Sequence, residues 1–167
     1  MADIPRVTVR PTVADDWARY RDLRLEMLTE SPSAYRETAS QASGFAEGDW
    51  RRRTGPDPAR STTLVAVHEG RWVGTAGAHL RRREAELVAV YVVADARGAR
   101  LGVLDALLEA VERWAADRAD SIILHVGEEN MRARRAYERR GFHPTGHRRR
   151  SWFTRRAADI EMRKRLG

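Results

Sequence analysis

The feature that most constrains this chain is a strand-like apolar run and an amphipathic segment, separated by a basic loop of small residues. The run is AELVAVYVV at 85–93, and the loop continues to Gly102. Apolar side chains then recur at the spacing of one helix face, which predicts a helix over 101–117. They are Leu101, Leu104, Leu107, Leu108, Val111 and Trp114. SIILHV at 121–126 is typical of a buried strand, so the three segments predict a parallel βαβ unit.

The chain before this unit predicts a strand, helices and a hairpin. Residues 6–11 alternate as a strand, and Thr12 with Asp15 forms a capping box for a helix that ends at SPSAY. A shorter, interrupted helical stretch is expected over 35–53. TTLVAVH and RWVGTAGAHL then predict two strands, joined by a turn at Glu69 and Gly70.

The chain after the unit predicts one more helix and two strands. Asn130 is expected to cap a helix that ends near Arg140, before Gly141. Strands are predicted over 142–150 and 156–165. The whole order predicts an α/β (α+β) fold, with a mixed, mostly antiparallel sheet of about six to seven strands flanked by about four helices. At 167 residues, the chain is expected to form one domain over 1–167.

Composition excludes several classes of site. Cysteine is absent, which rules out disulfides and thiolate ligands, and the five histidines have no metal-site spacing, so no metal is expected. No apolar stretch is long enough to span a membrane, and the N-terminus lacks a signal-peptide pattern. A cytoplasmic protein without membrane contact is therefore expected.

The positive charge is concentrated near the C-terminus. The chain has a formal net charge of +7, and residues 131–156 hold ten arginines and one glutamate. Such a block attracts phosphates or acidic partners. Nucleic acid is not favoured as a partner, because no aromatic interleaving or nucleic-acid motif accompanies the charge.

The loop before the amphipathic helix has the composition of an anion site. The first turn of a helix leaves amide groups without partners, and its dipole favours negative charge. Gly98 and Gly102 let an anion approach the backbone, and Arg97 and Arg100 add positive charge. The loop is neither a Walker loop nor a full dinucleotide fingerprint. Phosphate binding and a plain turn before a helix both remain open at this point.

Two longer motifs resemble the GNAT superfamily of N-acetyltransferases. VYVVADARGARLGVLDALLEAVERWA resembles its acetyl-CoA motif, Gln/Arg-x-x-Gly-x-Gly/Ala, with Arg97 and Gly102 at the two ends. Arg100 departs from that motif, because it stands where the family usually has its first glycine. HVGEENMRARRAYERRGF resembles the second motif, in which Asn, Ala, Tyr and Gly-Phe recur at this spacing. With the order of elements, the resemblance covers nearly the whole chain.

The resemblance implies a GNAT fold and transfer of an acetyl group from acetyl-CoA to a primary amine in a ternary complex, without a metal. It implies that Tyr137 is the general acid and that Glu86 occupies the position of the general base in some members. Asn130 would contact the cofactor. The remaining cofactor-binding residues implied are Val90, Tyr91 and Val92 along the pantetheine arm, and Arg97, Gly98, Ala99, Arg100, Leu101, Gly102 and Val103 at the diphosphate.

Each role has an alternative. Tyr137 could be a core aromatic, Asn130 only a helix cap, and Glu86 an exposed polar residue with deprotonation relayed by water to another group. His125 is expected to be a structural histidine, and Trp152 and Phe153 are expected to pack or to contact a second copy in a homodimer. A longer acyl-CoA, or a CoA-binding sensor without catalysis, are the alternatives for function. The sequence does not identify the acceptor, which could be a small molecule or a protein.

Overall fold

The computed structural model describes residues 6–151 and 157–167, and all its strands join one sheet. Trp152 and Phe153 lie outside the described residues. The strands are β1 (Thr8–Pro11), β2 (Ser61–His68), β3 (Arg71–Arg81), β4 (Glu84–Val92), β5 (Ser121–Gly127), β6 (His143–Arg150) and β7 (Ala158–Arg165). Their order across the sheet is β1-β2-β3-β4-β5-β7-β6, and only β4 and β5 pair in parallel. The predicted mixed, mostly antiparallel sheet with a parallel βαβ unit is confirmed.

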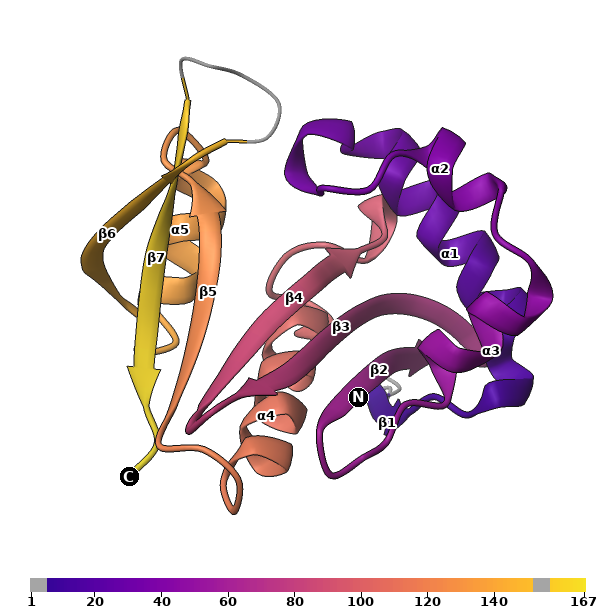
Figure 1. Ribbon diagram of the computed structural model, residues 1–167, viewed down its shortest axis with the longest axis horizontal. Coiled ribbons are helices and arrows are strands. Elements are labelled where there is room, and N and C mark those ends of the chain that lie inside the picture. The colour runs from indigo at the N-terminus through magenta and orange to yellow at the C-terminus, as the bar shows by residue number, and fades with distance from the viewer. Residues whose placement is uncertain (1–5, 152–156) are drawn as a thin grey trace.

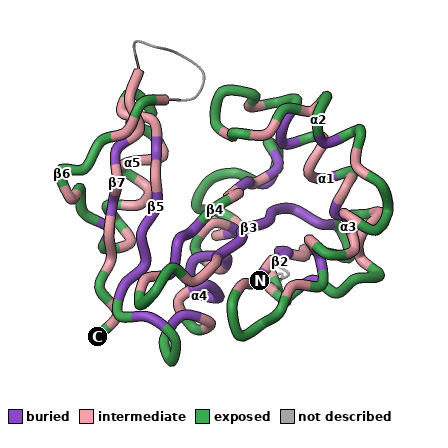
Figure 2. The backbone as a smooth tube through the Cα atoms, viewed as in Figure 1, coloured by how far each residue is buried: buried purple, intermediate pink, exposed green. Residues whose placement is uncertain are grey.

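The helices are α1 (Trp17–Glu30), α2 (Ala39–Ser43), α3 (Glu47–Thr54), α4 (Val103–Ala115) and α5 (Met131–Glu138). Helix α4 lies against one face of the sheet, because a Cβ atom at Gly74 of β3 would meet Val103 and Leu107. Helix α1 lies at the opposite face, where Tyr91 of β4 contacts two of its glutamates. Figure 1 shows the resulting layers, and Figure 2 shows buried residues concentrated in the central strands. Helix α4 also contributes buried residues, among them Leu107 and Leu108. No helix in the described residues is long and apolar enough to span a bilayer.

A bulge in β4 changes which residues share a face. Ala89 has a φ of 54°, and the pairing of β4 with β3 passes from Gly77–Val88 to Thr75–Tyr91. One extra residue in β4 is thereby accommodated. As a result, Tyr91 lies on the same face of the sheet as Val88, and that face is the one that α1 covers.

Strands β4 and β5 pair over a short distance and then separate. Glu84, Ala85 and Glu86 pair with Ser121, Ile122 and Ile123, and no later residue of β4 pairs with β5 in the described chain. Strand β5 continues beside β7 instead. Figure 1 shows the two strands diverging toward the C-terminal end of β4. We call the point beyond Glu86 and Ile123 the fork.

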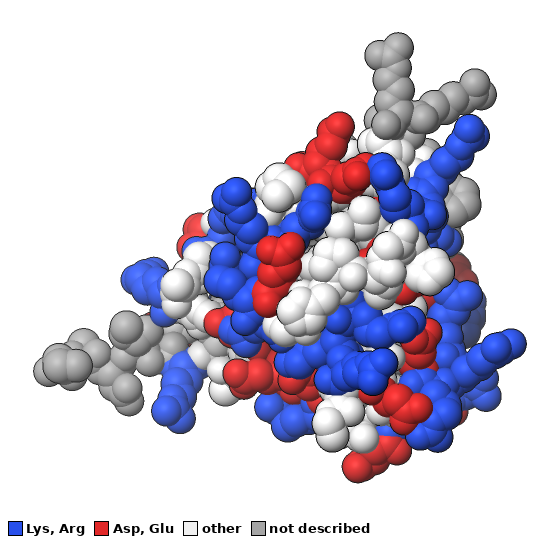
Figure 3. Space-filling model, turned by 90° about the vertical axis from the view of Figure 1, so that its left-hand side faces the viewer, with Lys and Arg blue, Asp and Glu red and all other residues white. Residues whose placement is uncertain are grey.

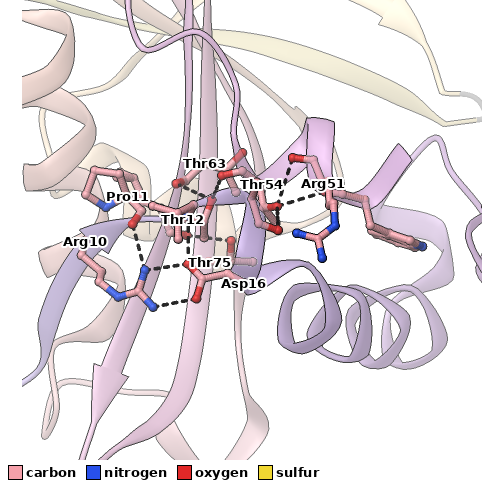
Figure 4. Close-up of polar contacts among 12 residues, drawn as sticks. Arg10, Pro11, Thr12, Asp16, Arg51, Thr54, Thr63 and Thr75 are labelled. Atoms are coloured by element: carbon pink, nitrogen blue, oxygen red, sulfur yellow. Dashed lines mark hydrogen bonds and ion pairs between the residues drawn. The ribbon is translucent and has the colours of Figure 1, made fainter. Parts of the chain in front are cut away.

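The predicted capping box between Thr12 and Asp15 is wrong. Thr12 instead ties β1 to α3 and β2: its hydroxyl donates to the carbonyl of Thr54 at 2.7 Å, and its amide to the carbonyl of Thr63 at 2.8 Å (Figure 4). The carboxylate of Asp16 accepts the amide of Val13 at 2.9 Å, so the helical segment begins one residue later. A tertiary contact of the threonine has overridden the local signal.

The other boundaries differ by a few residues. Residues 35–38 are not helical, because Thr38 caps α2: its hydroxyl accepts the amide of Gln41 at 3.1 Å, and its amide donates to the Gln41 side chain at 2.9 Å. Helix α4 begins at Val103 rather than at residue 101, since Gly102 is its N-cap in the left-handed region.

Strand β6 forms one edge of the sheet and carries much of the C-terminal charge. Its sequence, HPTGHRRR, is exposed at most positions. Figure 3 shows the side of the molecule at which β6 and β7 lie, and blue Arg and Lys side chains are abundant there. Like charges along an edge strand oppose edge-to-edge pairing with another chain, so this edge is protected against aggregation.

Substituting Gly74 is expected to destabilise the fold. A Cβ atom there would lie 2.9 Å from the backbone oxygen of Tyr91 and 2.9 Å from a methyl group of Val103. Gly74→Ala should cost about 1–3 kcal/mol of unfolding free energy, because β4 or α4 must shift. Urea denaturation measures this loss. Gly48→Ala in α3 is the control, since its nearest atom is a flexible arginine end at 3.6 Å, and it should be neutral or stabilising.

Candidate active site

The loop between β4 and α4 is shaped by two glycines in the left-handed region. Gly98 has a φ of 97° and Gly102 a φ of 60°, which residues with a side chain adopt only with strain. At both positions, the place that a Cβ atom would occupy has no other atom within 4 Å. The loop therefore presents open backbone, and a ligand can approach the main chain closely.

The first turn of α4 adds hydrogen-bond donors beside this backbone. The first bond within the helix runs from the amide of Ala106 to the carbonyl of Gly102, at 3.0 Å. The preceding amides, from Val103 to Asp105, therefore have no acceptor within the helix. The side chain of Val103 is buried and that of Leu101 packs against the core, so both residues can offer a ligand only their backbone. This arrangement fits a phosphate group.

The two loop arginines have different surroundings. Arg97 turns toward α1: its Nε donates to the carbonyl of Val92 at 2.8 Å, and its guanidinium contacts the carboxylate of Glu30. Arg100 is exposed, as is Ala99, and its φ is not positive. Arg100 therefore replaces the expected glycine without backbone strain, and its charge remains available to a bound anion.

The end of β4 presents carbonyl groups on the side where β5 has moved away. The carbonyl of Val90 accepts the hydroxyl of Tyr35 at 2.8 Å, and that of Val92 accepts Arg97. Tyr91 points to the α1 face, where its hydroxyl donates to Glu26 and Glu30. Beyond the fork, no strand of the described residues pairs with this edge of β4, and two of its carbonyls accept side-chain donors instead.

Asn130 and Tyr137 lie at the two ends of α5. The side-chain oxygen of Asn130 accepts the amide of Ala133 at 3.1 Å, so the predicted cap is confirmed. The ring of Tyr137 packs edge-to-face against Phe142, with centroids 5.8 Å apart. Burial, and then the nearby Tyr35, raise the pKa of Tyr137, so it remains protonated at neutral pH. Its hydroxyl donates to no other group in the described part of the chain.

Glu86 lies at the fork, and it is buried rather than exposed. Only 7% of its surface is accessible, and its carboxylate is 2.9 Å from Arg81 and 3.3 Å from His79. The neighbouring His125 lowers the pKa of Glu86 to about 2. Burial acts in the opposite direction, and Arg81 lowers the pKa further. A carboxylate with so low a pKa is a weak proton acceptor near neutral pH.

His125 lies beside Glu86 on the neighbouring strand. Its Nδ1 lies 3.3 Å from Oε1 of Glu86, and this nitrogen is buried and makes no hydrogen bond. Its Nε2 is 3.7 Å from Oε2 of Glu161. The sequence predicted only a structural role for His125 and gave no sign of this contact with Glu86. Among residues 6–151 and 157–167, no three acidic or histidine side chains are placed to hold a metal ion.

Glu86 is expected to contribute to acid-sensitive stability. Its pKa in the folded protein, about 2, lies below the ordinary value of 4.5, so ionisation stabilises the fold. The contribution is complete above about pH 4.5 and is lost as the pH falls toward 2. Its size is on the order of 2 kcal/mol. Urea denaturation from pH 7 to pH 2.5 should show a steeper loss for the wild type than for Glu86→Gln, and parallel curves would contradict this.

Two site residues carried no signal in the sequence. Tyr35 follows the helix-breaking SPSA segment, and Glu30 is the last residue of α1. Their contacts with Val90 and Arg97 join positions more than fifty residues apart in the sequence, and no local pattern reports such contacts.

The sequence model of the acetyltransferase (GNAT) family matches residues 20–142. This span contains the whole loop, both sides of the fork and helix α5. No curated protein sequence matches the chain.

Several solved structures have a similar fold. A GCN5-related N-acetyltransferase from Kribbella flavida has a TM-score of 0.75 at 23% identity, over 96% of this chain and 98% of that one. A GNAT-family acetyltransferase from Streptococcus pneumoniae has a TM-score of 0.73 at 19% identity, over 97% and 100%. The ribosomal-protein-S18-alanine N-acetyltransferase from Escherichia coli has a TM-score of 0.70 at 21% identity, over 96% and 94%.

Proposed function

The chain belongs to the acetyltransferase (GNAT) family, and from that premise we propose that it transfers an acetyl group from acetyl-CoA to a primary amine. The observation that carries the proposal is the open backbone at Gly98 and Gly102, next to the amides of the first turn of α4. A diphosphate requires close approach to amide donors, and this loop offers it. We further propose that residues 1–167 act as one catalytic domain, as their common sheet suggests.

The cofactor would be held at three places. Residues 97–103 would hold the diphosphate, with Arg100 adding charge and Arg97 fixing the loop through Glu30. The edge of β4 at Val90 and Val92 would receive the pantetheine arm in place of the missing β5 partner, with Tyr91 fixed to α1 between them. Asn130 would meet the arm from the start of α5. Acetyl-CoA supplies an activated thioester.

Tyr137 is proposed as the general acid. Its hydroxyl is protonated, has no competing acceptor in the described residues, and lies near Tyr35, which reaches the end of β4. It could therefore give a proton to a thiolate formed beside Val90. Glu86, in contrast, would act as a fixed negative charge at the fork.

The acceptor is proposed to be an amine on a protein or a small molecule. Escherichia coli S18-alanine N-acetyltransferase has a similar fold, so an alanine-initiated peptide belongs in a first panel. Spermidine and an acidic amine conjugate complete the panel, because the basic C-terminal region would repel the first and attract the second.

Two measurements test the proposal. Acetyl-CoA at a hundred times its Kd should stabilise the protein by roughly 2.7 kcal/mol in a thermal-shift assay. The acceptor panel, followed by release of the CoA thiol, should then show turnover. Absence of a shift at millimolar acetyl-CoA would remove the cofactor assignment. A shift without turnover on any amine would favour a CoA-binding sensor.

A further inference from the structure

The chain contains a single lysine, Lys164, in strand β7. Of its 31 basic side chains, all the others are arginines. A guanidinium stays protonated in proteins and offers no lone pair to an acyl carbon. Lys164 is therefore the only side-chain amine of the sequence that an acetyl donor could convert to an amide.

The amine of Lys164 is tied to helix α4. Its Nζ donates to Oε1 of Glu112 at 2.6 Å, and the two side chains are 25% and 28% exposed. A reagent in solution can thus reach the pair. An ammonium has three donors and no lone pair, so Nζ must lose a proton and give up the carboxylate before it can attack another molecule.

The stem of Lys164 lies against the backbone that follows α5. A Cβ atom at Gly141 would be 3.5 Å from Cε, 3.8 Å from Cδ and 4.0 Å from Cγ of the lysine. Gly141 has a φ of 89°, a conformation that favours glycine, and no side chain separates this backbone from the stem. Lys164 therefore joins three parts of the fold, which are β7, the turn after α5, and α4 through Glu112.

An open pocket lies beside this amine. Its volume is about 480 Å³, and its lining includes Lys164, Gly141, His143 and Arg165. None of the described residues that line it is acidic. Pockets of several hundred Å³ accommodate small ligands, so the reacting end of an acetyl donor has room to approach Nζ, and the transferred acetyl group has room to remain.

We propose that Lys164 is a latent acetylation site of this chain and that Glu112 suppresses its modification. The donor is an acyl thioester such as acetyl-CoA. The inference goes beyond the proposed function and does not depend on it, because an uncharged lysine amine is itself a nucleophile toward a thioester.

The step balances without a further reactant. The nitrogen of uncharged Lys164 bonds to the acetyl carbon, the carbon–sulfur bond breaks, and the departing thiolate takes up the proton that the nitrogen sheds. The products are acetyl-lysine and a free thiol. Acetylation removes the positive charge, so Glu112 loses its partner and α4 loses this link to β7.

The first test compares Glu112→Ala with Glu109→Ala, the same change at an exposed residue of α4. Alanine is used because a glutamine at 112 could still accept from Nζ, and because alanine preserves the helix. Each protein is incubated with acetyl-CoA and a reference peptide that contains one lysine, and mass spectrometry follows acetylation of both lysines. Thermal melting identifies folded variants.

Relative to the reference peptide, Glu112→Ala should acetylate Lys164 roughly threefold to fivefold faster than the wild type, which is the effect that an exposed ion pair can have. Glu109→Ala should match the wild type. Equal rates in Glu112→Ala and the wild type would overturn the proposal. So would a wild-type Lys164 that reacts as fast as the reference peptide.

Ionic strength provides a second readout, which a packing role of Glu112 would not change. Salt screens an exposed ion pair, so the ratio of the Glu112→Ala rate to the wild-type rate should fall toward one between roughly 20 mM and roughly 500 mM sodium chloride. A ratio that is constant with salt would show that the carboxylate does not act through its charge, and would overturn the proposal.

A donor without a diphosphate separates this inference from the proposed function. The acetyl thioester of N-acetylcysteamine keeps the reactive group of acetyl-CoA but lacks its phosphates. The faster acetylation of Lys164 in Glu112→Ala should persist with this donor. Its disappearance would show that the reaction requires the cofactor loop, and would overturn the direct step proposed here. If acetyl-CoA fails to stabilise the protein while this effect is found, the proposed function fails and the acetylation site stands.

Discussion

Replacing Gly102 with glutamate is expected to abolish the stabilisation that acetyl-CoA gives the protein. Gly102 precedes the first turn of α4, and the place of its Cβ atom is open. A carboxylate introduced there would stand where the diphosphate is expected, beside the free amides. Like charges brought together in this way cost several kcal/mol. The Kd should rise at least ~100-fold, and the roughly 2.7 kcal/mol gain at a hundred times the wild-type Kd should fall to about 0.4 kcal/mol or less.

Gly102→Ala separates charge from backbone strain. With a φ of 60°, either substituent costs about 1–2 kcal/mol of stability. The methyl group has open space, so acetyl-CoA should still shift the melting temperature of the alanine variant. Isothermal titration with acetyl-CoA gives both affinities directly. Equal binding by the two variants would place the diphosphate elsewhere.

Tyr137→Phe is expected to lower kcat roughly 10²-fold while acetyl-CoA binding is retained. The phenyl ring keeps the packing against Phe142, and only the hydroxyl, which has no other acceptor in the described residues, is removed. The loss stays near the low end of general acid catalysis, because a thiolate leaves tolerably well without full protonation.

Single-turnover kinetics at saturating substrates isolate the chemical step of this variant. Tyr20→Phe is the matched control, since Tyr20 is a buried tyrosine that packs against Trp50 on α3. An unchanged single-turnover rate in Tyr137→Phe would reduce Tyr137 to a packing residue.

The elements that the sequence predicted well are those with a strong local period. The apolar face of α4 and the buried run of β5 follow from spacing alone, because each pattern is contained within one element. Thr38 and Gln41 also fit a local capping-box pattern, Thr-x-x-Gln, so the sequence itself contains a signal for the start of α2.

What the sequence could not reveal depends on register between distant strands. The meeting of Glu86 with His125 requires the pairing of β4 with β5 at Ile123 and the separation that follows. Arg97 likewise seemed directed at a ligand, but its partner Glu30 lies at the far end of α1. Neither pair has a pattern within one segment, since each depends on how separate elements pack.

The bulge at Ala89 decides how β4 tolerates a change of residue and a change of length. A substitution there has to meet a φ of 54°, which glycine would satisfy more easily than alanine. A deletion of Ala89 would leave Val90 alone opposite Ala76, so the strand would become regular and Tyr91 would keep its pairing with Thr75. Tyr91 would therefore still face Glu26 and Glu30, and β4 can lose its bulge residue without turning this side chain to the other face.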